Sequence, residues 1–372
     1  MTTTTAAAWT ANDRDLNWSS PDQDDAALNF HRRLSGYEPT ALTPLPELAR
    51  ELGVAAVFAK DESTRLGMPA FKALGASWAV HRALETAQAN TDAEVVTATD
   101  GNHGRAVARF AREAGHPARI FVPAGGIHPS AVAAIRGESA EVVEVDADYD
   151  HSVAAAADYA AANGGVLVQD TAWEGYEEVP GWIVEGYSTL FREIDVQLNE
   201  AGHRAPDLIT VPTGVGSLLQ AALAHYRRAS AGDTVSSAAG DDDTAVVSVE
   251  TEAAACMGPS LDAGHPVTVE TGKTIMSGLN CGTPSSLAWP LVRDGLDAAV
   301  TVTDDAAIDA AHRLAELGVA AGPCGAASLA GVREALNGTD AESRRRHLGV
   351  DADSVIVLTV TEGSAANPVP DA

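Results

Sequence analysis

Lysine is almost absent from this sequence. Among 372 residues it occurs only at positions 60, 72 and 273, and the other basic residues are arginine. Lys72 lies in an apolar, helix-like run over residues 68–80. Unlike a guanidinium, its amine can lose a proton when desolvated and can form an imine with an aldehyde. Lys72 is therefore a candidate Schiff-base residue, and the alternative is an ammonium that extends from apolar surface into solvent.

Positive charge is scarce in general. Asp and Glu total 52 against 24 Lys and Arg, which gives a net charge of −28. Such a chain is repelled by nucleic acid and by anionic membranes, so neither is expected as a partner. Because the carboxylates are spread along the whole chain, we expect adaptation to high internal salt, in a halophilic and archaeal source. An acidic patch for one cationic partner is the alternative.

Cysteine and long apolar runs are also lacking. The three cysteines, Cys256, Cys281 and Cys324, are far apart and form no Cys-x-x-Cys pair, which favours a reducing cytoplasm without disulfides or a zinc cluster. No set of His, Cys and carboxylate residues has ligand spacing, so no metal site is expected. With no membrane-length apolar run and no signal-like beginning, we expect a soluble, cytoplasmic protein.

The rest of the chain alternates between short apolar strands and amphipathic helices. This order predicts an α/β fold with parallel sheets covered by helices. The strands are expected at 54–59, 94–99, 118–122, 141–145, 165–169, 208–211, 245–249 and 354–360. The helices are expected at 47–52, 105–114, 129–136, 152–162, 182–199, 218–228, 306–317 and after Gly325. Residues 1–35 are predicted to form a partly ordered arm, and the Asp-rich stretch 229–244 a solvated loop.

Four polar clusters follow predicted strands, at 100–104, 170–171, 213–217 and 361–363. Ligands of open parallel sheets bind beyond the carboxyl ends of the strands, so the clusters predict one small-molecule site. In the third cluster, Gly214, Val215, Gly216 and Ser217 precede a helix, which suits a phosphate group. No Gly-Lys-Ser/Thr follows, so this is not a nucleoside-triphosphate loop, and glycine turns without a ligand are common.

The first cluster offers polar groups of different chemistry. The Asn102 amide can donate to a ligand oxygen, or Asn102 can cap the following helix. His103 is more simply a packed structural residue than a catalytic one. The Asp100 carboxylate, next to a glycine turn, is a candidate proton acceptor.

Together these groups suit pyridoxal 5'-phosphate. Lys72 would bind the aldehyde, the glycine loop the phosphate, and Asn102 the phenolate oxygen. Thr361, after the last strand, would face the ring nitrogen. A hydroxyl there leaves that nitrogen largely unprotonated, which suits β-elimination.

At this point the sequence resembles the tryptophan-synthase-β-like, fold type II family of pyridoxal-phosphate enzymes. Phe71-Lys72, Gly101-Asn102-His103-Gly104 and the glycine loop resemble its motifs in the same chain order, over about residues 40–364. The resemblance implies an α/β fold of two domains with parallel twisted sheets. A small domain at 94–173 would be inserted in a large cofactor domain at 36–93 and 174–372, and the enzyme would be a homodimer.

Within that family, four runs resemble the diaminopropionate ammonia-lyases: 70–75, 98–105, 169–176 and 361–363. The resemblance implies elimination of ammonia from 2,3-diaminopropionate, which leaves pyruvate and a second ammonia. Lys72 would take the α-proton of one enantiomer and Asp100 that of the other, and Asp170 would contact the β-amino group. Dehydratases usually carry serine where this chain has Asp100.

Three alternatives remain at this point. The nearest is a serine or threonine ammonia-lyase of the same family. The others are a pyridoxal-phosphate carrier or sensor without turnover, and an α/β phosphosugar-binding module. The chain departs from the family pattern at Gly322-Pro323-Cys324-Gly325, where Glu-Ser-Gly is expected. The resemblance does not extend to the arm or to the Asp-rich stretch.

Overall fold

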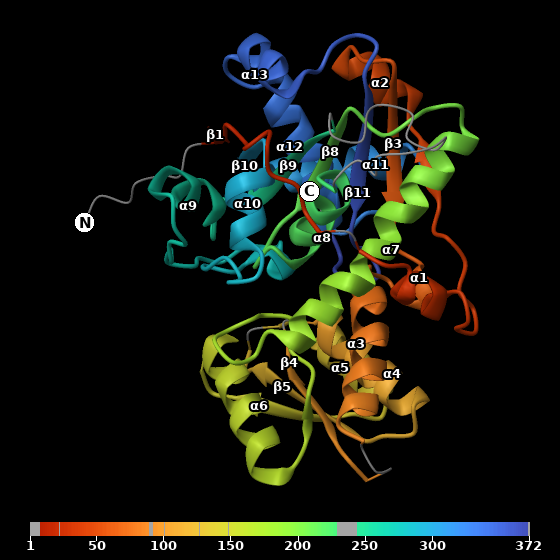
Figure 1. The fold of residues 1–372 in the computed structure, drawn as a ribbon, viewed down its shortest axis with the longest axis vertical. Helices are drawn as coiled ribbons and strands as arrows, with labels where there is room; N and C mark the ends of the chain where they lie inside the picture. Colours follow the sequence, from red (N-terminus) through yellow and green to blue (C-terminus); the bar gives the residue numbers. More distant parts are fainter. Residues whose placement is uncertain are drawn as a thin grey trace. The chain divides into compact units, whose positions relative to one another are not determined.

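The computed structural model describes residues 8–21, 23–88, 92–99, 101–125, 127–147, 149–228 and 244–370. The chain divides into two compact units. The large unit comprises Met1–Asp24, Pro39–Thr64 and Leu190–Ala372, and the small unit comprises Asp25–Glu38 and Arg65–Thr189. Each unit has its own β-sheet with helices packed on it (Figure 1).

The large unit is built on a seven-stranded sheet of order β1-β10-β9-β8-β11-β3-β2. The five central strands are parallel, and the short edge strands β1 and β2 pair antiparallel with β10 and β3. Every residue of β8, β9 and β11 is buried, as parallel strands covered on both faces require. The strands are β1 (Trp9–Ala11), β2 (Leu42–Pro44), β3 (Ala56–Asp61), β8 (Leu208–Pro212), β9 (Ala245–Thr251), β10 (Ala298–Val302) and β11 (Val355–Val360).

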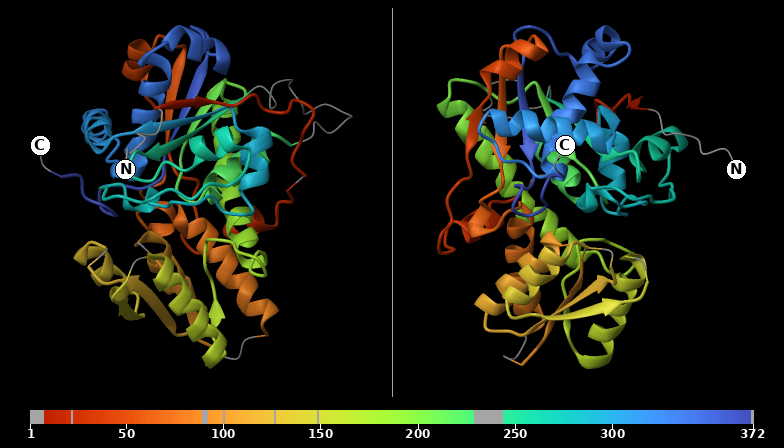
Figure 2. Two further views of the ribbon diagram at one scale, coloured as in Figure 1. Left: turned by 90° about the vertical axis from the view of Figure 1, so that its left-hand side faces the viewer. Right: turned by 180° about the vertical axis from the view of Figure 1, so that it is seen from behind.

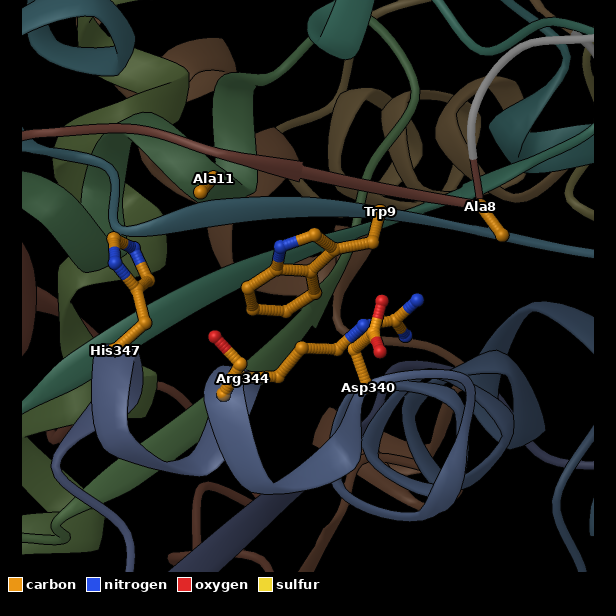
Figure 3. A pocket seen from close by; sticks show the side chains of 7 residues that line it. Ala8, Trp9, Ala11, Asp340, Arg344 and His347 are labelled. Atoms are coloured by element: carbon orange, nitrogen blue, oxygen red, sulfur yellow. The ribbon is translucent and has the colours of Figure 1, made fainter.

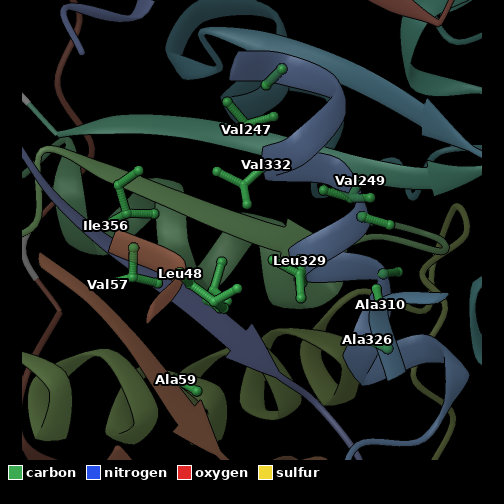
Figure 4. Close-up of a cluster of buried hydrophobic side chains, with 14 of the residues drawn as sticks. Leu48, Val57, Ala59, Val247, Val249, Ala310, Ala326, Leu329, Val332 and Ile356 are labelled. Atoms are coloured by element: carbon green, nitrogen blue, oxygen red, sulfur yellow. The ribbon is translucent and has the colours of Figure 1, made fainter. Parts of the chain in front are cut away.

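The main core of the large unit lies between its sheet and helix α12. Leu329 and Val332 of α12 pack on Val247 of β9 and Ile356 of β11 (Figure 4). The connection from β8 to β9 crosses the sheet in the direction opposite to the connection from β10 to β11, which contains α12. Because crossovers between parallel strands are right-handed, α8, in the first connection, covers the opposite face. The helices are α2 (Pro46–Leu52), α8 (Ser217–Tyr226), α9 (Met257–Ala263), α10 (Trp289–Gly295), α11 (Asp304–Glu316), α12 (Pro323–Asn337) and α13 (Ala341–Leu348).

The small unit has a four-stranded parallel sheet of order β6-β5-β4-β7. Helices α4 and α5 connect β4 to β5 and β6, while α6 leads back past β4 to β7 and therefore covers the other face (Figure 2). The strand order thus reverses between β4 and β7. The elements are α1 (Ala26–His31), α3 (Lys72–Thr86), β4 (Val95–Ala98), α4 (Asn102–Glu113), β5 (Ala118–Pro123), α5 (Pro129–Gly137), β6 (Glu141–Val145), α6 (Tyr149–Asn163) and β7 (Val166–Leu167).

Helix α7 (Glu178–Glu200) contributes to both units, because the division falls after Thr189. Among the described helices, none combines the length and apolar character that a membrane span needs. The predicted α/β class with parallel, helix-covered sheets is confirmed. The predicted Asp-rich loop lies almost entirely outside the described residues, and the predicted arm contains β1 and α1 in its described part.

Candidate functional site

Lys72 is the first residue of α3, which packs closely on α7. A Cβ atom at Gly75 would lie 2.5 Å from Cε1 of Tyr187, and one at Gly186 would lie 2.6 Å from the Leu74 carbonyl oxygen. Glycine at both positions lets the two helices approach, which fixes the start of α3. The Lys72 ammonium lies 5.4 Å from the Phe71 ring centroid and 5.9 Å from that of Tyr187, within cation–π range.

The other two lysines have different surroundings. Lys60 is fully buried, and its Nζ donates to Oε2 of Glu193 at 2.6 Å, to the Thr40 carbonyl at 2.8 Å and to Oε1 of Gln197 at 2.9 Å. Lys273 is exposed. Lys72, with 21% of its side chain exposed, is therefore the lysine best placed to meet a ligand.

Asp170 forms a partly buried ion pair with Lys72, because its Oδ2 lies 2.7 Å from Nζ. Burial by itself would raise the pKa of the Asp170 carboxyl, but the nearby His103 ring and the Lys72 ammonium lower it to about 2. Burial also lowers the pKa of His103, against the effect of the Asp170 charge. The His103 ring is therefore neutral near pH 7, and Lys72 is the charge that keeps Asp170 ionised there.

His103, for which the sequence favours a structural role, is buried beside Asp170. Its Nε2 lies 2.9 Å from the Val168 carbonyl oxygen and must donate to it. Its Nδ1 lies 3.8 Å from Asp170 Oδ2, and among the described residues this buried atom has no hydrogen-bond partner. The His103 ring thus lies between the Val168 carbonyl, just after β7, and the Asp170 carboxylate.

The run Gly101-Asn102-His103-Gly104, which we call the asparagine loop, is held by Thr99. The Thr99 Oγ1 accepts from the N–H groups of Gly101 and Gly104, both at 2.9 Å. A Cβ atom at Gly104 would clash with the Thr99 side chain, so glycine is needed there. Asn102 is the first residue of α4 and Gly101 occupies the N-cap position, so the alternative that Asn102 caps the helix is wrong. Asp100 lies outside the described residues.

These groups meet where the strand order of the small unit reverses. The asparagine loop follows β4, and Asp170 lies just beyond β7 on the other side of the reversal. The crevice outside such a reversal point is where open α/β sheets bind ligands. Within the small unit, the structure therefore brings Lys72, His103 and Asp170 together, at the predicted edge of the sheet.

The glycine loop lies in the large unit, between β8 and α8. Gly216 is the N-cap of α8, has a φ of 100°, and caps the helix without a side-chain hydrogen bond. A Cβ atom at Gly214 would lie 2.9 Å from the Gly278 carbonyl oxygen and 3.2 Å from Sγ of Cys281. The initial N–H groups of an uncapped helix are an anion-binding arrangement.

The other predicted residues of this loop and of the last strand lie nearby in the large unit. The Val215 carbonyl accepts from the Ser285 N–H at 2.8 Å, and Ser217 is buried as the first residue of α8. Thr361 is buried directly after β11, which pairs with β8. Within this unit the glycine loop and Thr361 thus follow neighbouring parallel strands.

The loop that departs from the family pattern is packed against Glu362. The Cys324 N–H, at the start of α12, donates to Glu362 Oε1 at 3.2 Å. Burial and the Glu362 charge raise the pKa of the Cys324 thiol, so it is not a reactive thiolate. Cys324 is a packed residue of this loop.

A separate pocket of about 450 Å³ lies in the large unit between β1 and α13 (Figure 3). Trp9, Asp340, Arg344 and His347 line it, and the Arg344 guanidinium lies 5.1 Å from the Trp9 ring centroid. None of the residues predicted for the site lines this pocket. It is therefore separate from the chemistry described above.

Sequence reasoning missed two residues at the small-unit site, Tyr187 and Gln169. Tyr187 comes from α7, more than a hundred residues from Lys72, and no local pattern indicates the contact. Gln169 directly precedes Asp170 and was visible only as part of the 169–176 run. Its side chain bonds to β4, as described below.

A family model described as "Pyridoxal-phosphate dependent enzyme" matches residues 34–360. The diaminopropionate ammonia-lyase of Salmonella typhimurium is 35% identical over 370 residues, which cover 91% of this chain and 88% of that protein. The crystal structure of the Escherichia coli diaminopropionate ammonia lyase, in complex with an aminoacrylate-PLP azomethine reaction intermediate, matches with a TM-score of 0.83 and 30% identity, and the match covers 97% of this chain and 96% of that one.

The L-threonine dehydratase of Corynebacterium glutamicum is more distant, at 28% identity over 80% of this chain and 64% of that protein. The likeness to the ammonia-lyases is therefore both stronger and more complete. With the family model matching most of the sequence, the chain belongs to the family of pyridoxal-phosphate-dependent enzymes.

Proposed function

We propose that this protein is a diaminopropionate ammonia-lyase, which eliminates ammonia from 2,3-diaminopropionate to yield pyruvate and a second ammonia. The structural observation that carries the proposal is the ionised Asp170 beside Lys72 at the reversal point of the small sheet. The similarity to ammonia-lyases over most of the chain supports it independently.

The residues present fit pyridoxal phosphate. The start of α8 has glycine at its N-cap and no side-chain cap hydrogen bond, so its first N–H groups suit a phosphate group. Lys72 would hold the aldehyde, Asn102 the phenolate oxygen, Gly214, Val215, Gly216 and Ser217 the phosphate, and Thr361 the ring nitrogen. When bound, the cofactor supplies the electron sink that makes removal of an α-proton feasible.

The protein's own groups would then move protons and hold charges. Lys72 Nζ takes the α-proton of one enantiomer, and the Asp100 carboxylate takes that of the other. The Asp170 carboxylate pairs with the β-ammonium of the substrate. When the bond between the β-carbon and nitrogen breaks, its electron pair leaves with the nitrogen as ammonia, and hydrolysis of the unsaturated amine gives pyruvate and the second ammonia.

A carboxylate beside the β-carbon distinguishes this reaction from a dehydration. An ionised Asp170 attracts a β-ammonium directly but offers a neutral β-hydroxyl only a hydrogen bond. We therefore place serine/threonine ammonia-lyase activity second.

The experiment is a comparison of substrates. Purified protein loaded with pyridoxal phosphate is assayed for keto-acid release from both enantiomers of 2,3-diaminopropionate, from both enantiomers of serine, and from L-threonine. We expect kcat/KM for one or both diaminopropionate enantiomers to exceed that for serine and threonine by at least about tenfold, or ~1.4 kcal/mol. Faster turnover of serine or threonine would contradict the proposal, and Lys72→Ala, which should be inactive, is the control for background reaction.

We further propose that the enzyme is a homodimer of the cytoplasm, that it works at high salt, and that residues 94–173 act as a small domain inserted in the large one. The composition supports the salt adaptation, because 52 acidic residues face only 24 basic ones. The family resemblance supports the homodimer and the inserted domain.

A further inference from the structure

The side chain of Gln169 continues the sheet of the small unit where the β7 strand ends. Val166 and Leu167 of β7 pair with Val95 and Val96 of β4, and the Val168 N–H still donates to the Val96 carbonyl. Beyond that point the fully buried Gln169 side chain takes over. Its Oε1 accepts from the Ala98 N–H at 2.9 Å and from Thr97 Oγ1 at 2.8 Å.

These contacts fix which way the amide faces. A backbone N–H can only donate, so the Gln169 oxygen must point toward Ala98 and its NH₂ group must point away from β4. That NH₂ group donates to the Tyr149 hydroxyl at 2.9 Å and approaches Oδ1 of Asp170 at 3.4 Å. Lys72 donates to the other carboxylate oxygen, Oδ2. The two donors therefore act on different oxygens of one carboxylate.

The backbone of Gln169 is also held. Its N–H donates to the Tyr176 hydroxyl at 2.9 Å, and that hydroxyl donates to the Leu167 carbonyl at 2.9 Å. Tyr176 is itself fixed by a backbone bridge to Trp173 and by stacking of the two rings. Both ends of Gln169 are thus immobilised, directly beside Asp170.

We propose that Gln169 is a positioning residue that aims the Asp170 carboxylate and so sets the selectivity for a β-amino over a β-hydroxyl substrate. The inference rests on the proposed function and adds to it the residue that determines specificity. A carboxylate rotates easily about its last bond, and a fixed donor at Oδ1 confines that rotation while Lys72 restrains Oδ2. The benefit of a fixed orientation is larger for an ammonium, because charge pairing with Asp170 is stronger than the hydrogen bond to a hydroxyl.

Two substitutions separate the roles of the amide. Gln169→Met keeps the length of the side chain but removes the donor to Asp170 and the acceptor for Ala98. Gln169→Glu keeps the acceptor for Ala98 and Thr97 but places a second carboxylate beside Asp170, which raises the pKa of Asp170 by like-charge repulsion. Thr97→Val is the matched control, since it removes one bond to Gln169 and leaves the amide donor in place.

The experiment measures kcat/KM for diaminopropionate and for serine in the cofactor-loaded variants, across a range of pH. We expect the diaminopropionate-to-serine ratio to fall about tenfold in Gln169→Met and to change less than about twofold in Thr97→Val. In Gln169→Glu, the acid limb of the diaminopropionate profile should move to higher pH. The pH profile of Gln169→Glu can be measured with diaminopropionate alone. It therefore tests the inference even if serine is not turned over or if Gln169→Met does not fold.

Equal losses for both substrates, together with an unshifted acid limb, would show that Gln169 only supports the fold and would overturn the inference. Failure of the proposed function is a separate result, because the unmodified enzyme itself would then not turn over diaminopropionate.

Discussion

The Asp170 carboxylate owes its charge to its neighbours. Burial opposes ionisation, and the His103 ring and the Lys72 ammonium outweigh that effect. A pKa of about 2 in the folded protein, against 3.8 ordinarily, means that ionised Asp170 stabilises the fold. This contribution is fully present above about pH 4 and is lost as the pH falls toward 2.

Asp170→Asn should therefore change the pH dependence of stability. In the cofactor-free protein, we expect the difference in free energy of unfolding between the unmodified protein and Asp170→Asn to decrease by about 2 kcal/mol between pH 5 and pH 2. Urea unfolding at a series of pH values measures it. A difference that stays constant over this range would contradict the pKa assignment.

At the residue scale, the sequence predicts groups that follow strand ends but not the contacts between distant residues. Lys72 and Asp170 were found because lysine is scarce and because polar residues after apolar strands indicate a sheet edge. The contact of Tyr187 with Lys72 depends on the close packing of α3 and α7. The role of the Gln169 amide depends on β7 being only two residues long. Neither is a property of the local sequence.

At the element scale, the strands and helices with a strong apolar period were predicted almost to the residue, as in β6 (Glu141–Val145) and α11 (Asp304–Glu316). The short edge strands β1 and β2 were missed, because three residues are too few to show alternation. Strand β10 was missed although it is apolar, since it follows a stretch of 46 residues, 252–297, in which the sequence shows no clear alternation of elements.

The elements of the large unit are linked by a buried ion pair. Lys60 on β3 contacts Glu193 and Gln197 on α7 and the Thr40 carbonyl. The Thr40 hydroxyl in turn donates to the buried Glu62 at 2.6 Å. Thr40, Glu62 and Glu193 each lie within a few residues of a point where the chain passes from one unit to the other. This cluster, which we call the Lys60 cluster, therefore lies on the large-unit side of three of the four such points.

Removal of one charge from the Lys60 cluster should be costly. Glu193→Gln leaves a buried ammonium without its counter-charge, so we expect a loss of about 3 kcal/mol in the free energy of unfolding. Lys60→Met combined with Glu193→Gln removes both charges and should recover at least half of that loss. Denaturant unfolding followed by tryptophan fluorescence measures both. Equal losses in the single and double variants would contradict the ion-pair explanation, and the exposed Lys273→Met is the control.

At the scale of the whole molecule, a net charge of −28 should make stability depend on salt. Repulsion between exposed carboxylates acts over about 10 Å at 0.1 M salt but only about 3 Å at 1 M. We therefore expect the unfolding temperature to rise steadily as potassium chloride increases from about 0.1 M to 1 M. Differential scanning fluorimetry can follow it, with an uncharged osmolyte as control. An unchanged or falling temperature would contradict adaptation to high salt.

The scarcity of lysine has a practical consequence for handling the protein. One of its three side-chain amines is enclosed by acceptors, a second is paired with Asp170, and Lys273 alone is exposed. Amine-directed coupling to a bead or sensor surface would therefore attach the folded chain mainly through one known side-chain position. Molecules attached through Lys273 would share one attachment point and so present the same face to every substrate solution passed over them.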